Sequence, residues 1–591
     1  MDEVRQENEF ANMLIESLKK GLPQAIYEDE DSFDSYILTS DRIKLKVSVF
    51  SPDMKKKWPV ILIRNPYQSN EFFILSALSK IFSSCGYALV YVRVRGTLGS
   101  EGEWLPFENE RNDGRDVIDW IAEQEWCDGN IGTFGASYLG HTQWCIADYD
   151  HPMLKTMFIS VYGTNGYESF YRRGMFRQEI WTEWAAQMIY TNKDKLLMPE
   201  VAVPIRKAAF SVYPQNQLGE QMEKKHCDWY ETWLKNQKAT DSYWADGFWK
   251  ELRQTAPKVK IPVFLHGGWF DIFLRSQLTA WRELPEKIRK QSRFMIGPWH
   301  HSGLPGGDLE YPGEEKSGLN GLFSAIRWFD YRLKQKEFTE QIGVIEAYQI
   351  GENKWHIFQD DIQCDENLVL YFVQGTKADD GNIEVRNYCL IENMSESGKI
   401  TYTYDPNYPV ESCGGTLIAN HHDDFANPEC SCFQPKAQSR ADVISFFSEQ
   451  TEDEFSISGN IIAKLFVSSD VAATSFAIKV MEQFHDGRTV NIRDDITDIR
   501  WRTEEQYEEY IPDKCVELEM KLLDIDWEIS KGSRIRVDIA SSNYPAYHVH
   551  PNSLAPWYEE HENKIAHQSI YYGEKYPSQI IIPIRKGEKN A

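Results

Sequence analysis

Apolar residues along the chain follow patterns typical of an open α/β sheet. Residues 59–67 and 86–96 (PVILIRNPY and GYALVYVRVRG) are almost continuously apolar, as expected of strands covered on both faces. Residues 111–123 place valine and isoleucine at helical spacing, and the strand-like run 131–135 precedes a second helical pattern at 137–147. Strand, helix, strand and helix in this order predict a doubly wound parallel sheet.

Changes in this pattern predict the domain organisation. Residues 1–35 contain an amphipathic helical pattern and are expected to form an N-terminal helical extension. An α/β core is predicted over 36–149 and 258–350, interrupted by aromatic-rich helices at 150–257 that form a cap placed to roof an active site. Residues 351–591 contain short strands separated by turns, which predicts a β-sandwich or a β jelly-roll domain, the latter of the galactose-binding-like kind.

Charge and composition exclude several classes of partner. The formal net charge of −26 argues against nucleic acid or an anionic membrane, since both require basic patches. No apolar run is long enough to span a bilayer, and the first residues lack a secretory signal. The ten cysteines are scattered, so free thiols and a cytoplasmic location are expected.

One cluster raises the question of a metal. Cys430 and Cys432 lie near the His-His-Asp-Asp run at 421–424. Zinc sites usually space their cysteines by two to four residues, and this Cys-x-Cys pair does not match. A solvated polar loop is the favoured interpretation, and neither a metal nor an organic cofactor is expected.

The strongest chemical motif is GTFGASYLG, residues 132–140. A strand ends at Gly135, Ser137 sits on the turn, and a helix follows, as in the nucleophile elbow of α/β-hydrolases. The strict motif has glycine two residues after the serine, whereas this chain has Leu139 there and Gly140 one position later. The motif alone supports a reactive serine and an unreactive structural turn about equally.

Two later strand ends supply the partners that such a serine needs. Asp271 follows the strand IPVFLHGG, and His301 follows the strand RFMIGP, so the order is serine, acid, histidine as in α/β-hydrolases. Asp271 also fits a helix N-cap, although that role leaves His301 unexplained. His300 competes with His301 for the role of base, and His266 is expected to be a packed residue.

Donors for a developing oxyanion are expected next to the serine. The backbone N–H of Tyr138 follows Ser137 directly, and the hydroxyl of Tyr67 ends a neighbouring strand. From the residues alone, a packed aromatic is the favoured interpretation of Tyr67.

These motifs resemble those of the cocaine-esterase and X-prolyl dipeptidyl-peptidase family of serine hydrolases. The matching pieces are RNPY, SEGEW, EWCDGNIGTFGASYLGHTQW, GGWFD and GPWHH, then YDPNYPV and IASSNYP. The resemblance implies that Ser137 is the nucleophile, that Asp271 orients the base His301, and that Tyr67 and Tyr138 form the oxyanion hole. It also implies a hydrolase core, a helical cap and a jelly roll, and the family pattern Gly-x-Ser-Tyr-x-Gly accounts for Leu139.

Two positions depart from the family pattern. Arg93 stands where the family usually has aspartate, in Asp-x-Arg-Gly, which puts a local ion pair in doubt. Phe270 stands where tyrosine is common, and only packing or one hydrogen bond depends on it.

The sequence therefore predicts a serine hydrolase that cleaves a carboxylic ester or a related acyl bond through an acyl-enzyme. Alternatives are an X-prolyl dipeptidyl peptidase, an α-amino-acid ester hydrolase, and an inert protein whose jelly roll binds carbohydrate. The expected partner is a small ester, amide or short peptide, and a monomer and a homodimer both stay open. The cap charges Glu168, Arg172, Arg173 and Arg177 are candidates for substrate contact, but a solvated helix face is the favoured interpretation for most of them.

Overall fold

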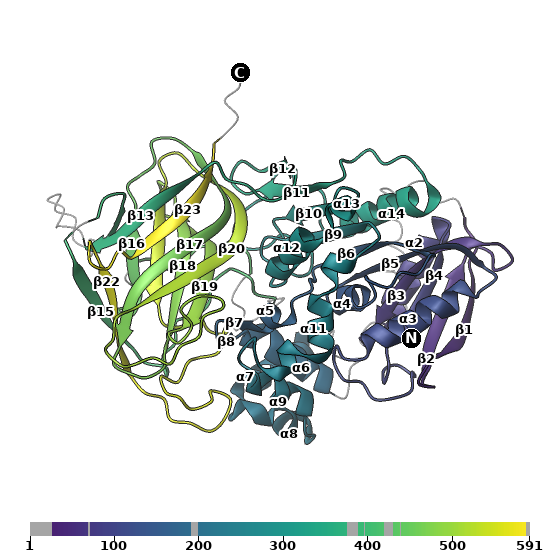
Figure 1. The fold of residues 1–591 in the computed structure, drawn as a ribbon, viewed down its shortest axis with the longest axis horizontal. Helices are drawn as coiled ribbons and strands as arrows, with labels where there is room; N and C mark the ends of the chain where they lie inside the picture. The colour runs from purple at the N-terminus through teal and green to yellow at the C-terminus, as the bar shows by residue number, and fades with distance from the viewer. Residues whose placement is uncertain are drawn as a thin grey trace.

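Two sheet structures dominate the computed structural model, which describes residues 27–68, 71–190, 199–374, 388–394, 396–418, 429–437 and 439–586. A ten-stranded sheet forms the first part, and an eleven-stranded β-structure forms the C-terminal part (Figure 1). Most of the predicted N-terminal helical extension lies outside the described residues. Its last part differs from the prediction, because strand β1 (Asp31–Leu38) already begins within it.

The ten-stranded sheet is parallel through its centre. In spatial order its strands are β1, β2 (Lys44–Ser51), β4 (Ala88–Arg93), β3 (Trp58–Asn65), β5 (Cys127–Ala136), β6 (Leu154–Ser160), β9 (Val263–Gly268), β10 (Arg293–Gly297), β11 (Val344–Gln349) and β12 (Lys354–Phe358). Neighbours from β4 to β11 pair in parallel, and the pairings of β1, β2 and β12 are antiparallel. The carboxyl ends of the parallel strands therefore share one edge, where open α/β sheets bind their ligands.

Helices cover both faces of this sheet. They are α2 (Glu71–Ser84) and α14 (Leu319–Lys334) on one face, and α3 (Glu110–Ala122), α4 (Tyr138–Trp144), α12 (Leu274–Glu283) and α13 (Glu286–Arg289) on the other. On β3, Ile61 and Ile63 join the core beneath α14, whereas Val60 and Leu62 join the core beneath α3. Because successive strand side chains point to opposite faces, such a strand must be apolar at almost every position.

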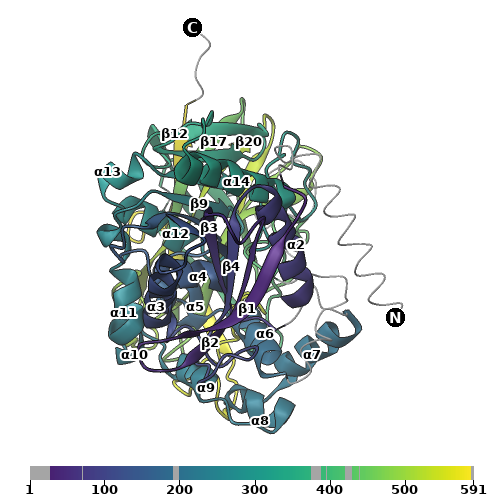
Figure 2. The same cartoon turned by 90° about the vertical axis from the view of Figure 1, so that its right-hand side faces the viewer.

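Between β6 and β9 the chain leaves the sheet and forms the cap. Its elements are α5 (Gly166–Phe170), β7 (Tyr171–Arg172), β8 (Met175–Phe176), α6 (Gln178–Ile189), α7 (Pro199–Ser211), η2 (Gln215–Gln217), α8 (Leu218–Glu223), α9 (Asp228–Lys235), α10 (Ser242–Ala245), α11 (Gly247–Arg253) and η3 (Ala256–Lys258). Figures 1 and 2 both show the helices α6 to α9 below the core strands β3, β4 and β9. Aromatic side chains fill the cap: Phe170 stacks on Trp181 with ring centroids 3.7 Å apart, and Trp233 lies edge-on to both.

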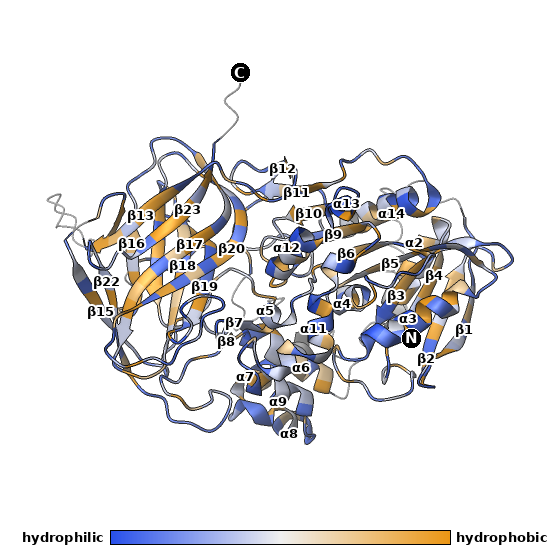
Figure 3. Cartoon of the chain, in the orientation of Figure 1, coloured by the Kyte–Doolittle hydropathy of each residue, from blue (hydrophilic) through white to orange (hydrophobic). Residues whose placement is uncertain are grey.

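The C-terminal part is built of strands, which confirms the predicted β domain. The strands are β13 (Glu366–Gln374), β14 (Tyr388–Ile391), β15 (Gly398–Tyr404), β16 (Ile444–Phe447), β17 (Phe455–Ser469), β18 (Ser475–Gln483), β19 (Thr489–Asp498), β20 (Val516–Ile529), β21 (Arg534–Ala540), β22 (Ala566–Tyr572) and β23 (Gln579–Arg585). Strand β17 pairs with β20, β22 and β23, and its register shifts between Asn460 and Ile462. A bulge of this kind lets one strand contribute to two layers. Figure 3 shows hydrophobic residues concentrated on the strands of both sheets.

Two strands of the core sheet lie in segments that the sequence assigned to other domains. Strand β6 lies inside the segment 150–257 predicted as cap, yet it is a central strand of the core sheet. Strand β12 lies beyond residue 350 and still pairs with β11. A short apolar run does not reveal by itself whether it is a strand or part of a helix, so both boundaries shift.

Cysteines and helix lengths complete the description of the fold. All ten cysteines are free, as expected from their scatter. Within the described ranges, every helix is too short or too polar to traverse a lipid bilayer.

Candidate active site

Four of the predicted site residues follow strands that are close together in the core sheet. Tyr67 follows β3, Ser137 follows β5, Asp271 follows β9 and His301 follows β10. Because these parallel strands are separated only by β6, their carboxyl ends bring the four residues to one edge of the sheet. Asp271 and His301 come more than a hundred residues after Ser137 in the chain, yet hydrogen bonds link the three side chains.

The turn that carries Ser137 has the strained backbone of a nucleophile elbow. Ser137 has φ 57° and ψ −124°, a conformation that few non-glycine residues adopt. Its backbone N–H donates to Ser160 O at the end of β6. A side chain at Gly140 would place its Cβ 2.8 Å from the Cβ of Tyr162, so glycine is required where α4 packs against the sheet. The family spacing, with glycine three residues after the serine, therefore has a steric cause.

Ser137, His301 and Asp271 form a continuous hydrogen-bonded chain. The Ser137 Oγ lies 2.9 Å from His301 Nε2, and His301 Nδ1 lies 2.8 Å from Asp271 Oδ1. A carboxylate only accepts hydrogen bonds, so Nδ1 carries the proton and Nε2 accepts the proton of the serine. Asp271 is fully buried, and His301 is mostly buried.

The competing histidine, His300, and the packed histidine, His266, take no part in this hydrogen-bonded chain. His300 is buried, with Nε2 3.6 Å from Glu429 Oε1 and Nδ1 accepting the Ser302 N–H. His266 stacks on Trp299 with ring centroids 4.5 Å apart, as expected for a packed residue. Burial lowers the pKa of both His300 and His266 to about 4, so both are neutral at pH 7.

Tyr67 and the backbone of Tyr138 lie beside the serine. The Asn65 side chain holds the Tyr67 backbone, donating from Nδ2 to its carbonyl at 2.7 Å and accepting from its N–H at 3.2 Å. Burial raises the pKa of the Tyr67 phenol, although contacts with the indole of Trp184, the Ser137 side chain and the Tyr138 backbone act in the opposite direction. The hydroxyl therefore stays protonated, as a hydrogen-bond donor to an oxyanion must.

A buried polar network, which the sequence did not suggest, braces this edge from behind. The Tyr138 hydroxyl donates to Glu110 Oε1 at 3.0 Å and accepts the Phe107 N–H at 2.9 Å. Arg64 directly precedes Asn65. Its Nη1 lies 3.3 Å from Glu110 Oε2, and its Nη2 donates to Thr142 O in α4 at 2.6 Å. Burial, the largest effect, raises the pKa of Glu110. The network ties β3, α3 and α4 together around the elbow.

The two departures from the family pattern have local explanations. Arg95 pairs with Asp41 and Asp113, each at 2.6 Å, so an ion pair is present although Arg93 replaces the usual aspartate. Phe270 is buried beneath the guanidinium of Arg493 from the β domain, whose central carbon lies 5.3 Å from the ring centroid. The Phe270 side chain therefore serves packing at this position.

The interpretation of the cap charges as a solvated helix face is wrong. Arg172 and Arg173 lie on and just after β7 and are buried, where they pair with Asp495 and Glu504 of the β domain. We call these four residues the interdomain ion cluster.

The other two cap charges are also at least partly buried. Arg177 lies over the Tyr547 ring and donates to Thr416 Oγ1 at 3.3 Å. Glu168 is half-buried, and burial raises its pKa. The two contacts of Arg177 join the cap to the β domain.

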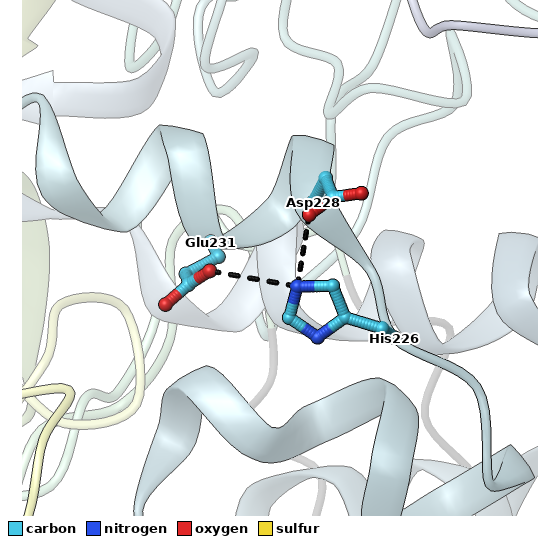
Figure 4. Close-up of side chains that lie close together, drawn as sticks. All are labelled: His226, Asp228 and Glu231. Carbon is cyan, nitrogen blue, oxygen red and sulfur yellow. Dashed lines mark ion pairs between the residues drawn. The ribbon is translucent and has the colours of Figure 1, made fainter.

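Metal-ligating side chains gather at one place among the described residues. His226, Asp228 and Glu231 lie at the start of α9 on the cap surface (Figure 4), with His226 Nε2 2.8 Å from Asp228 Oδ1. The imidazole is exposed and also pairs with Glu220 through Nδ1, which raises its pKa. Ion pairs at the surface therefore explain why these three side chains lie close together. Cys430 and Cys432 are buried, so the exposed polar loop expected there is wrong for these two residues, and positions 421–424 lie outside the described part of the chain.

A parallel sheet covered by helices, with a hydrogen-bonded serine, histidine and aspartate at its carboxyl edge, defines a serine hydrolase of the α/β-hydrolase fold. Two family models match the chain. The model for the X-Pro dipeptidyl-peptidase (S15 family) covers residues 41–303. The model for the X-Pro dipeptidyl-peptidase C-terminal non-catalytic domain covers residues 401–581. The two parts of this chain therefore match the catalytic and the C-terminal domain of X-Pro dipeptidyl-peptidases (S15 family).

Individual proteins match over nearly the whole length. The cocaine esterase of Rhodococcus sp. (strain MB1 Bresler) is 28% identical over 576 residues, which cover 92% of this chain and 97% of that protein. An aminopeptidase from a marine sediment Thaumarchaeota archaeon is similar in structure, with TM-score 0.77 and 21% identity over 95% of this chain and 98% of that one. An α-amino acid ester hydrolase has TM-score 0.74 and 20% identity over the same shares of the two chains. At this identity the two structures support the fold alone.

Proposed function

We propose that this hydrolase cleaves carboxylic esters by two-step acyl transfer, with Ser137 as nucleophile and His301 as general base. The observation that carries the proposal is the hydrogen-bonded chain from Ser137 through His301 to Asp271. The near full-length similarity to a protein named as a cocaine esterase supports an ester substrate over a peptide. The acyl group and the alcohol of the substrate are left open.

Acylation begins when His301 Nε2 takes the proton of Ser137 Oγ as the oxygen attacks the ester carbonyl. Asp271 accepts the hydrogen bond from Nδ1, which fixes the tautomer and stabilises the imidazolium. The Tyr67 hydroxyl and the Tyr138 N–H donate to the oxyanion of the tetrahedral intermediate. His301 then gives its proton to the leaving alcohol, and water activated by the same nitrogen releases the acid.

Replacement of the nucleophile tests the proposal directly. Ser137→Ala should abolish hydrolysis of 4-nitrophenyl butyrate and labelling by a fluorophosphonate probe, because both need the same oxygen. A matched variant, Ser302→Ala, changes a serine beside the site and should leave both signals within about threefold of wild type. Ester hydrolysis that survives Ser137→Ala would rule out Ser137 as the nucleophile.

A second candidate function is cleavage of X-prolyl or aminoacyl substrates, which the matched X-Pro dipeptidyl-peptidase models favour. Side-by-side kinetics with 4-nitrophenyl butyrate and Ala-Pro-4-nitroanilide separate the two. We expect the larger kcat/KM for the ester. A larger value for the anilide would reverse the order of the two candidates.

A further inference from the structure

We propose that Trp184 of the cap is a positioning residue for the oxyanion donor Tyr67, and the inference rests on the proposed role of Tyr67. Trp184 lies on α6, and its indole Nε1–H donates to the Tyr67 hydroxyl oxygen at 3.4 Å. The contact joins the cap to the carboxyl edge of the core sheet. Through this contact the cap orients the Tyr67 hydroxyl that donates to the oxyanion, in addition to covering the site.

The reason lies in the geometry of a phenol. A phenolic O–H prefers the plane of its ring, so the proton of Tyr67 has two favoured directions. An N–H donated to the oxygen occupies the lone-pair side and disfavours the proton there, because two donors cannot share that position. The proton then takes the other in-plane direction. The Ser137 side chain and the Tyr138 backbone lie close enough to the phenol oxygen to lower the pKa of Tyr67, so this oxygen lies beside the serine.

The donor and the acceptor are both held in place. The Trp184 ring stacks on Phe107 with centroids 5.8 Å apart and planes 21° apart, and it lies nearly parallel to Tyr138 at 6.5 Å. On the other side, Asn65 fixes the backbone of Tyr67 through two hydrogen bonds. A donor that is already oriented requires no reorganisation as charge develops on the substrate. The accepted hydrogen bond also polarises the Tyr67 O–H and makes it a stronger donor.

The sequence did not distinguish Trp184 from the other cap aromatics. Trp181 and Trp233 pack in the same cluster, and Trp181 donates its N–H to a backbone carbonyl, Ser169 O, at 2.7 Å. Trp184 instead directs its N–H to a side chain that ends a core strand.

The test is a double-mutant cycle on ester hydrolysis. Trp184→Phe removes the N–H and keeps an aromatic ring, and it should lower kcat about three- to tenfold while KM stays within about twofold. In a Tyr67→Phe background the same change should have no further effect on kcat, because the hydroxyl that Trp184 orients is gone. Trp229→Phe is the matched control, since its ring lies 6.0 Å from that of Trp184, and it should leave kcat near wild type.

Several outcomes would overturn the inference. They are an unchanged kcat in Trp184→Phe, an equal loss in the Tyr67→Phe background, or the same loss in Trp229→Phe. Unfolding midpoints of all variants separate a general loss of structure from the specific effect. Failure of the proposed function looks different, because Ser137→Ala would then keep its activity, or Tyr67→Phe alone would leave kcat unchanged.

Discussion

Replacing Asp495 by asparagine should destabilise the protein by about 3–5 kcal/mol, the usual cost of removing one partner from a buried ion pair. Asp495 accepts from Arg172 Nη2 at 2.9 Å and lies 2.7 Å from Arg173 Nη2. The Asp495 side chain is only 3% exposed. Water therefore cannot replace the carboxylate beside the two arginines when it is removed. Asparagine keeps the shape of the side chain but removes the charge.

Glu504 provides a matched control within the same interdomain ion cluster. It contacts the same two arginines, but its side chain is 36% exposed. Water therefore screens it, and Glu504→Gln should cost only about 1 kcal/mol or less. The two variants remove the same charge from the same partners and differ mainly in burial.

Urea unfolding followed by tryptophan fluorescence measures both variants. Burial by itself would raise the pKa of Asp495, but the charges of Arg172 and Arg173 outweigh it and hold the pKa well below its ordinary value of 3.8. The stabilisation is therefore complete above about pH 5, where the unfolded carboxyl is almost fully ionised, and it fades as the pH falls further. The gap between wild type and Asp495→Asn should shrink by about 1.4 kcal/mol per pH unit below pH 4.

Two results would refute this reasoning. The first is an Asp495→Asn variant that loses no more stability than Glu504→Gln at pH 7, since burial would then not matter. The second is a gap that stays constant between pH 6 and pH 3, since the stabilisation would then not come from an ionised carboxylate.

Three further changes test the candidate site. Gly140→Ala should lower kcat about a hundredfold because the new Cβ forces α4 away from Tyr162, which ester kinetics would detect; wild-type activity would contradict the steric argument. His300→Gln should leave kcat within about threefold, whereas His301→Gln should lower it by about 10⁴-fold or more, and the reverse result would exchange their roles. Tyr138→Phe should lower the free energy of unfolding by about 1–3 kcal/mol because a buried carboxyl and amide lose their partner, and an unchanged urea midpoint would exclude that.

The order of residues along the chain revealed the core of the site. Asp271 and His301 each follow an apolar run, and parallel strands bring their carboxyl ends together, so order and strand ends predicted a serine, an acid and a histidine at one edge. The choice of His301 over His300 came from the family resemblance. The left-handed backbone of Ser137 follows from the same turn. Local patterns suffice here because the sheet itself sets the geometry.

Contacts between distant segments could not be predicted in this way. Arg172 looks like a solvated charge in the sequence because its partner Asp495 follows 323 residues later. The sequence does not indicate the hydrogen bond from Trp184 to Tyr67 either, because the pattern of aromatic residues does not show where an indole N–H points. Both depend on how the cap lies against the other parts of the chain.

The interdomain ion cluster also imposes an order on biosynthesis. The ribosome releases the chain from its N-terminus, so Ser137, Asp271 and His301 are all translated before Asp495. At bacterial to eukaryotic elongation rates the delay between His301 and Asp495 is roughly 10–40 seconds. During that time Arg172 and Arg173 lack both of their partners in the cluster, Asp495 and Glu504. A nascent chain stalled in this interval is expected to contain a complete triad beneath a cap that is not yet anchored.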